Sequence, residues 1–192
     1  KIIGITGTKG KGTTATLLYL MLKEAGFDTY LGGNIGKSSL DFLDDLKEDS
    51  VVVLELSSFQ LQDLDISPHI AIVLGVTSDH LDYHKGKIEY LEAKSAIVKY
   101  QSERDIAIFN KDYANNDYFS AMTKVKKFFV SAKETNFSGD GAHIAGSKIV
   151  YCEGVKCELI GDVAKIALIG AHNLENVLAS VVAARQFGVS IA

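Results

Sequence analysis

The sequence lacks tryptophan and has one proline, Pro68, and two cysteines among its 192 residues. Two cysteines are too few for the disulfide framework of a small secreted protein. No apolar run reaches the roughly 18 to 20 residues that a membrane-spanning helix needs, and no signal-peptide pattern opens the chain. An apolar share of 47% with 23% charged residues is typical of a globular protein. The sequence therefore predicts a cytoplasmic globular domain without membrane insertion.

The sequence also lacks an excess of charge of one sign. Its 20 Lys and Arg residues against 24 Asp and Glu residues give a net charge of −4. Bulk electrostatics therefore favours neither a nucleic acid nor an anionic membrane as a partner. We expect no nucleic-acid partner, and any phosphate group that the protein binds must be held by a local site.

Cys152 and Cys157 are separated by four residues. This pair has too few ligands and no neighbouring histidines, so it does not fit a zinc site. We expect both cysteines to be reduced, structural thiols.

Hydrophobic periodicity predicts an α/β fold. Short β-branched apolar segments alternate with helix-period segments as far as about Val130, which is the pattern of βαβ units in a mostly parallel sheet flanked by helices. The predicted strands are residues 2–6, 29–31, 51–54, 70–76, 106–109 and 128–130, and the predicted helices are residues 13–25, 87–100 and 170–187, the last followed by Gly188 as a cap. Short alternating segments at residues 137–143, 148–151 and 156–160 predict a small appended antiparallel β-hairpin region.

A glycine-rich turn joins the first predicted strand to the first predicted helix. It reads Gly7-Thr8-Lys9-Gly10-Lys11-Gly12-Thr13. Backbone N–H groups at a helix N-terminus bind anions, and Lys11 can add a point charge for the β- and γ-phosphates of a nucleotide. Gly12 stands where a strict P-loop has its magnesium-binding hydroxyl, so Thr13 is the nearest substitute. The alternative is a glycine-rich turn without a ligand; a dinucleotide site is disfavoured because G-x-G-x-x-G is absent.

Ionisable side chains follow two of the predicted strands. Glu55 follows the strand at residues 51–54, at the sheet edge where open α/β folds bind ligands. A carboxylate beside a bound phosphate can hold Mg²⁺. Taken alone, Glu55 could equally be a helix cap or a surface residue. Two aspartates and two histidines follow the strand at residues 70–76, and this clustering indicates a second metal or catalytic position, with His80 favoured over His84.

Two further segments are less specific when taken alone. Lys94, on the predicted helix after these histidines, would be an ordinary solvated lysine. Asn173 and Asn176 lie three residues apart at the start of the last predicted helix, so their amides share a face on which they could contact a nucleobase edge. Helix capping by Asn173 explains that local pattern equally well.

Taken in order, these segments resemble the central ATP-binding domain of the Mur ligase family, the ATP-dependent amide-forming ligases of peptidoglycan synthesis with their folylpolyglutamate synthase relatives. The resemblance spans essentially the whole chain, so residues 1–192 are expected to form one central domain. It implies a P-loop-type sheet and the cofactors ATP and Mg²⁺. ATP-binding residues would be Gly7, Thr8, Lys9, Gly10, Lys11, Gly12, Thr13, Asn173 and Asn176.

The resemblance also implies roles in catalysis. Thr13 and Glu55 would hold one Mg²⁺, and His80 with Lys94 would hold a second. In this family the lysine at the position of Lys94 is carbamylated, which replaces an ammonium that Mg²⁺ would repel by an oxygen ligand. Lys11, His80 and Lys94 would be the catalytic residues.

Within the family, the segments around Asn34 and Ser58 are most similar to the branch that adds D-glutamate to a UDP-muramoyl peptide precursor, which implies that these two residues contact the small-molecule substrates. The implied reaction passes through an acyl phosphate. Three residues depart from the family pattern: Lys9, Gly12 and Gly75.

Two alternatives stay open. Gly12 also fits the Gly-Lys-Gly-Thr form of folylpolyglutamate synthases, so another amino-acid ligase of the family is possible; the missing hydroxyl also fits a nucleotide-binding module without catalysis. The chain starts in a strand, whereas family members carry an N-terminal UDP-binding domain and a C-terminal domain. We therefore expect an excised central domain, monomeric and incapable of complete ligation by itself.

Overall fold

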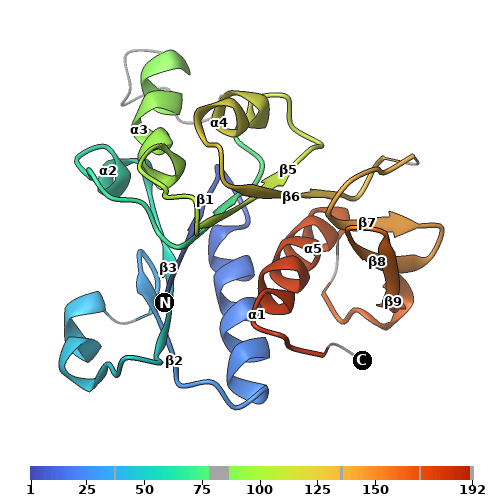
Figure 1. Ribbon diagram of the computed structural model, residues 1–192, viewed down its shortest axis with the longest axis horizontal. Helices are drawn as coiled ribbons and strands as arrows, with labels where there is room; N and C mark the ends of the chain where they lie inside the picture. Colours follow the sequence, from blue (N-terminus) through green and yellow to red (C-terminus); the bar gives the residue numbers. More distant parts are fainter. Residues whose placement is uncertain (37, 78–86, 135, 169, 191–192) are drawn as a thin grey trace.

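A nine-stranded sheet organises the molecule (Figure 1). The computed structural model describes residues 1–36, 38–77, 87–134, 136–168 and 170–190. The strand order is β2-β3-β1-β4-β5-β6-β7-β8-β9. All pairs from β2 to β7 are parallel, whereas β7–β8 and β8–β9 are antiparallel. The structure thus confirms the predicted α/β class and the appended antiparallel region.

The strands have these bounds: β1 Ile2–Thr6, β2 Thr29–Gly33, β3 Val51–Glu55, β4 Ile70–Val73, β5 Ile106–Asn110, β6 Lys126–Ser131, β7 Gly141–Ala145, β8 Lys148–Glu153 and β9 Lys156–Asp162. Prediction and structure agree to within a few residues for β1 to β6. The predicted strand at residues 70–76 is shorter in the structure, because β4 ends at Val73 and the chain turns into the candidate site.

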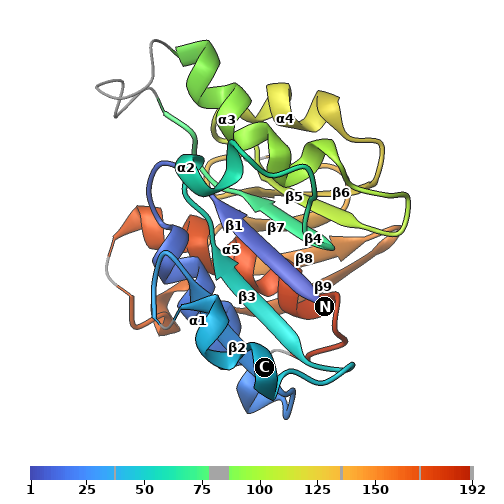
Figure 2. The same ribbon diagram turned by 90° about the vertical axis from the view of Figure 1, so that its left-hand side faces the viewer.

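Helices cover both faces of the sheet (Figures 1 and 2). On one face lie α1 (Lys11–Glu24) and α5 (Ala171–Arg185); on the other lie α2 (Ser58–Leu61), α3 (Lys87–Lys99) and α4 (Asn116–Met122). Short 3₁₀ helices occupy Ser39–Asp45 and Val163–Lys165. Within the described residues no helix is long and apolar enough to cross a membrane.

The alternation of side chains along each strand produces two cores. In β4, Ile70 and Ile72 pack into the cluster that contains α1 and α5, while Ala71 and Val73 pack into the cluster that contains α3 and α4. A strand buried on both faces needs apolar residues at every position, which is why the sequence shows continuous rather than alternating apolar runs there. α5 ends as predicted, since Gly188 has a φ of 74° and its N–H donates to the Arg185 carbonyl.

The expectation of two reduced cysteines is wrong. Cys152 on β8 and Cys157 on β9 form a disulfide, with their Cα atoms 4.1 Å apart. A tight turn between antiparallel strands places these two residues directly opposite each other in the ladder. This cross-strand register depends on where the turn falls, which the spacing of the two cysteines alone does not give.

Candidate functional site

The candidate site lies at the carboxyl-terminal edge of the parallel sheet. β1, β3, β4 and β5 run in the same direction, so the segments that follow them converge there. In open α/β sheets this edge is where ligands bind. The glycine-rich turn after β1 and Glu55 at the end of β3 both lie at this edge, as the sequence predicts.

The glycine-rich turn ends in an N-terminus suited to an anion. Gly10 is the N-cap of α1, in the left-handed region with φ 84°, and the helix begins at Lys11. A glycine supplies no capping side chain, so the first-turn N–H groups have no cap from this residue. The Lys11 Nζ donates to the Thr8 carbonyl at 3.3 Å, which folds the lysine back over its own loop. The turn therefore combines backbone N–H donors with the positively charged side chain of Lys11.

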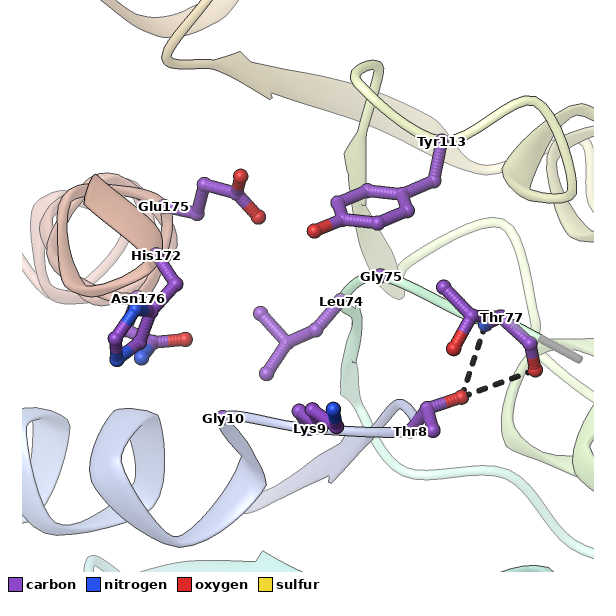
Figure 3. Close-up of a pocket in the computed structure, with 10 residues that line it drawn as sticks. All are labelled: Thr8, Lys9, Gly10, Leu74, Gly75, Thr77, Tyr113, His172, Glu175 and Asn176. Carbon is purple, nitrogen blue, oxygen red and sulfur yellow. Dashed lines mark hydrogen bonds between the residues drawn. The ribbon is translucent and has the colours of Figure 1, made fainter. Parts of the chain in front are cut away.

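The neighbouring segment after β4 holds this loop in place. The Thr8 N–H donates to the Gly75 carbonyl at 2.8 Å, and the Thr77 N–H donates to the Thr8 hydroxyl at 2.9 Å (Figure 3). Thr8 is buried. These hydrogen bonds join the loop to the segment that follows β4, and they fix the direction of the loop's donor groups.

Two features require a glycine at position 10: the left-handed backbone conformation and the close approach of the Asn176 side chain. A Cβ at this position would lie 2.3 Å from the Asn176 Oδ1. We expect Gly10→Ala to lower the free energy of unfolding by about 3 kcal/mol, because a left-handed residue with a Cβ is strained and the Asn176 amide must also move. Gly26→Ala is the matched control: Gly26 has φ 88° with nothing within 4 Å of its Cβ position, so only about 1 kcal/mol of backbone strain is expected. Denaturant unfolding measures both, and equal losses would contradict the Asn176 contact.

Glu55 lies directly beside the N-terminus of α1. It is 5% exposed, and its Oε1 accepts a hydrogen bond from the Asn34 Nδ2 at 3.4 Å. A Cβ on Gly12 would lie 3.1 Å from the other carboxylate oxygen, Oε2. Glycine at position 12 therefore lets this carboxylate approach the helix closely. The structure brings Asn34, Glu55 and the loop together, and Thr13 lies one residue further along α1.

Lys94 is deeply buried at this site. The residue is 2% exposed, its Nζ donates to the Thr6 hydroxyl at 3.2 Å and the Gly7 carbonyl at 3.4 Å, and it lies 4.7 Å from the centre of the Tyr90 ring. Burial, and after it the charge of Lys11, lowers the pKa of the Lys94 amine to about 7. About half of the amines are then neutral at neutral pH. The interpretation of Lys94 as a solvated lysine is therefore wrong, because the sheet edge and α3 enclose it.

His80, the remaining predicted metal ligand, lies outside the described residues, together with His84 and the two aspartates beside it. Ser58 is the first residue of α2 and is 6% exposed. Ser57 caps that helix by accepting the Gln60 N–H. The role of Ser58 in substrate binding stays a prediction.

A cavity of about 470 Å³ adjoins the glycine-rich turn (Figure 3). The turn, the segment after β4, the segment after β5 and the start of α5 surround it; the lining residues are Thr8, Lys9, Gly10, Leu74, Gly75, Thr77, Tyr113, His172, Glu175 and Asn176. The volume falls in the range of small-ligand sites. Sequence reasoning identified the loop residues and Asn176 but missed Tyr113, His172 and Glu175. The available signal for Tyr113 was a run of polar residues just after a buried strand.

Asn176 joins α5 to α1 as well as lining the cavity. Its Oδ1 accepts a hydrogen bond from the Thr14 hydroxyl at 3.2 Å, and its Nδ2 donates to the Asn173 Oδ1 at 3.1 Å. Asn173 lies within the first turn of α5, whose N-cap is Gly170, so the capping alternative for Asn173 is wrong. Asn173 orients Asn176 and is not among the described residues that line the cavity.

The family model described as "Mur ligase middle domain" matches residues 5–184. A protein of Clostridium botulinum (strain 657 / Type Ba4) named UDP-N-acetylmuramoylalanine--D-glutamate ligase is 42% identical over 182 residues, covering 94% of this chain and 38% of its own length. A protein of the same name from Symbiobacterium thermophilum is 41% identical over 182 residues, covering 95% of this chain and 40% of its own length. The chain thus spans about two fifths of the length of these curated relatives.

Solved structures show the same fold. A UDP-N-acetylmuramoyl-L-alanyl-D-glutamate--2,6-diaminopimelate ligase superposes with a TM-score of 0.74 at 23% identity, over 98% of this chain and 43% of that one. A MurF ligase from Thermotoga maritima, solved in complex with ADP, superposes with a TM-score of 0.69 at 21% identity, over 100% of this chain and 46% of that one.

Proposed function

The chain belongs to the Mur ligase family, and from this we propose that it is the ATP-binding central domain of a ligase that adds D-glutamate to UDP-N-acetylmuramoyl-L-alanine. The names of the relatives at 41 to 42% identity support the substrate pair. The proposal places residues 1–192 between a UDP-binding domain and a C-terminal domain, in a cytoplasmic monomer that acts on small molecules.

One observation carries the proposal. The cavity opens directly onto the glycine-rich turn, and Glu55 and Lys94 lie at the same sheet edge. A nucleoside triphosphate needs a cavity for its base, backbone donors for its phosphates and carboxylate oxygens for its cation. The cavity, the glycine-rich turn and Glu55 support these three roles in turn.

In the proposed site, the turn from Gly7 to Gly12 holds the phosphates and Lys11 swings from the Thr8 carbonyl to the β,γ-phosphates. The donor set proposed for Mg²⁺, namely Thr13, Glu55, His80 and carbamylated Lys94, consists of oxygen ligands and one imidazole. The buried Glu55 carboxylate, which closely approaches Gly12 in the first turn of α1, fits a hard cation. Magnesium bound there would neutralise the phosphates and polarise the substrate carboxylate.

Lys94 is suited to carbamylation because burial lowers the pKa of its amine to about 7, so the neutral amine is well populated near neutral pH. The neutral amine is the form that adds CO₂: its nitrogen lone pair forms the N–C bond, one C=O bond of CO₂ opens to a carboxylate, and one N–H proton is released to solvent. The resulting carbamate would present oxygens where the ammonium now lies.

The proposed reaction transfers the γ-phosphoryl group of ATP to the substrate carboxylate, which forms an acyl phosphate and releases ADP. The amine of D-glutamate then attacks the acyl carbon, and phosphate leaves as the amide forms. The protein contributes mainly positioning and charge neutralisation. The proposal assigns Asn34 to substrate contact near the cation, and its hydrogen bond to Glu55 supports this assignment.

A substrate panel tests the proposal on a full-length ligase that carries this chain as its middle domain. We expect ATP-dependent phosphate release with UDP-N-acetylmuramoyl-L-alanine and D-glutamate, and none with a folate and L-glutamate. The reverse pattern would favour a folylpolyglutamate synthase, for which Gly12 is the supporting residue. ATP binding without phosphate release on any pair would instead indicate a non-catalytic nucleotide-binding module.

A further inference from the structure

The disulfide between Cys152 and Cys157 lies in the antiparallel part of the sheet, and neither cysteine lines the cavity beside the glycine-rich turn. β9 is the last strand of the sheet order, at the opposite end from β2 (Figure 1). Among the described residues, no strand lies beyond β9 on that side. Cys152 on β8 pairs with Cys157 on β9, so the direction from Cys152 to Cys157 runs toward this free edge.

The two cysteines differ in their access to solvent. Cys152 is 8% exposed and belongs to the core, whereas Cys157 is exposed. An open groove of about 640 Å³ borders Cys157, and its lining includes Lys156, whose positive charge attracts an anion such as a thiolate. In thiol–disulfide exchange a thiolate attacks one sulfur and expels the other, and access decides which sulfur is attacked. Cys157 is therefore the sulfur that an incoming thiolate reaches.

The β8–β9 hairpin has contacts that hold it together without the disulfide. The ladder between the two strands continues on the far side of the bridge, where the Lys148 Nζ donates to the Asp162 Oδ2 at 2.6 Å. Arg185 on α5 donates to the Glu158 carboxylate on β9. The disulfide closes a loop of only four residues, so it restrains the unfolded chain less than a long-range bridge would. Reduction therefore leaves two thiols opposite each other in a folded hairpin, positioned to form the bond again.

Exchange with a low-molecular-weight thiol proceeds in two steps. Its thiolate attacks the Cys157 Sγ, the bond to Cys152 breaks, and Cys152 leaves as a thiolate that takes a proton from solvent. A second small thiolate then attacks the small molecule's sulfur in this mixed disulfide, which releases the Cys157 thiolate and forms the small-molecule disulfide. Two electrons pass from the two small thiols to the protein pair, and the reverse sequence oxidises the pair again.

We propose that Cys152 and Cys157 form a reversible redox site, in which Cys157 exchanges with low-molecular-weight thiols and Cys152 resolves the mixed disulfide. Cytosolic disulfides are usually transient, because the thiol pool of that compartment reduces those that it can reach. The exposed sulfur of Cys157 meets this condition. The redox site goes beyond the proposed ligase function and does not depend on it, since it uses neither the cavity nor the glycine-rich turn.

Mass spectrometry of the folded full chain, after alkylation of its free thiols, tests the inference with reduced and oxidised glutathione as the probes. Reduced glutathione should convert the wild-type disulfide to two thiols without denaturant, and oxidised glutathione should then restore it. In Cys152→Ser, oxidised glutathione should stay attached to Cys157, because no second sulfur expels it. Cys157→Ser keeps only the buried Cys152 and should take up glutathione at least roughly tenfold more slowly, since buried thiols are inert.

The two serine variants are matched controls for each other, because each removes one sulfur from the same ladder pair. Equal glutathione uptake by both variants overturns the inference, since an opened hairpin would expose either sulfur alike. A wild-type disulfide that survives reduced glutathione in the folded chain also overturns it and identifies a permanent structural bridge. The wild-type cycle needs no substitution, so it decides the question even where thermal unfolding shows that a variant fails to fold. The proposed function stands under each of these outcomes.

Discussion

Replacing Lys11 by alanine is expected to reduce ATP-dependent amide formation by about 10²- to 10³-fold, the range seen when one preorganised donor to a developing charge is removed. Lys11 is the first residue of α1, and its ammonium already lies at the loop, where it donates to the Thr8 carbonyl. The backbone donors of the turn do not depend on the side chain, so the fold and part of the phosphate binding should survive. Phosphate release by the full-length ligase measures the loss.

Lys23→Ala is the matched control for this experiment, since it removes a lysine from the last turn of the same helix, where the side chain is exposed. We expect it to have near wild-type turnover. The assignment of Lys11 fails if Lys11→Ala keeps its activity, or if the two alanine variants lose activity equally, because helix destabilisation would then explain the effect.

Replacing Lys94 by alanine is the second substitution with a large expected effect. Turnover should fall by about 10²-fold or more, because an oxygen-bearing group proposed to hold Mg²⁺ is lost from a buried position. Short carboxylates such as acetate or formate should restore part of the activity, since they supply oxygens and fit the space that the truncated side chain leaves. Turnover of the variant, measured with and without added carboxylate, tests both expectations.

Lys99→Ala is the control here, because Lys99 lies on the same helix, α3, and is exposed. It should show neither defect nor rescue. An Lys94→Ala enzyme that is folded by thermal unfolding and inactive at every carboxylate concentration would argue against a carbamate and for a purely structural amine. Full activity without any carboxylate would argue against a catalytic role altogether.

Much of the fold could be predicted because its signals are local. The continuous apolar runs of β1, β3 and β4 show that both faces of the sheet are covered, and helix-period segments between them require parallel crossovers. The glycine-rich turn was recognisable for the same reason, since strand, turn and helix N-terminus are consecutive in the chain. α4 was missed because seven residues are too short to establish a helical period.

Other features of the molecule depend on how separate elements pair and pack. The cysteine pair was misjudged because its chemistry is set by strand register in the β8–β9 hairpin. Without the family resemblance Lys94 would be taken for a solvated residue, because nothing in its own helix shows that Thr6 and Gly7 enclose its amine. In each case the sequence contains the residue, but its environment comes from another strand.

The sequence by itself determined the α/β class, the family resemblance and the glycine-rich turn, because each is encoded by residues within a few positions of one another. Only the tertiary structure decided which residues line the cavity. It placed the Tyr113 ring in the space over Gly75 and the Glu175 carboxylate at the same cavity, which joins residues from the segments after β4 and β5 with α5. Such contacts depend on strand order and on the packing of α5 against α1, which are properties of the whole folded chain rather than of any segment.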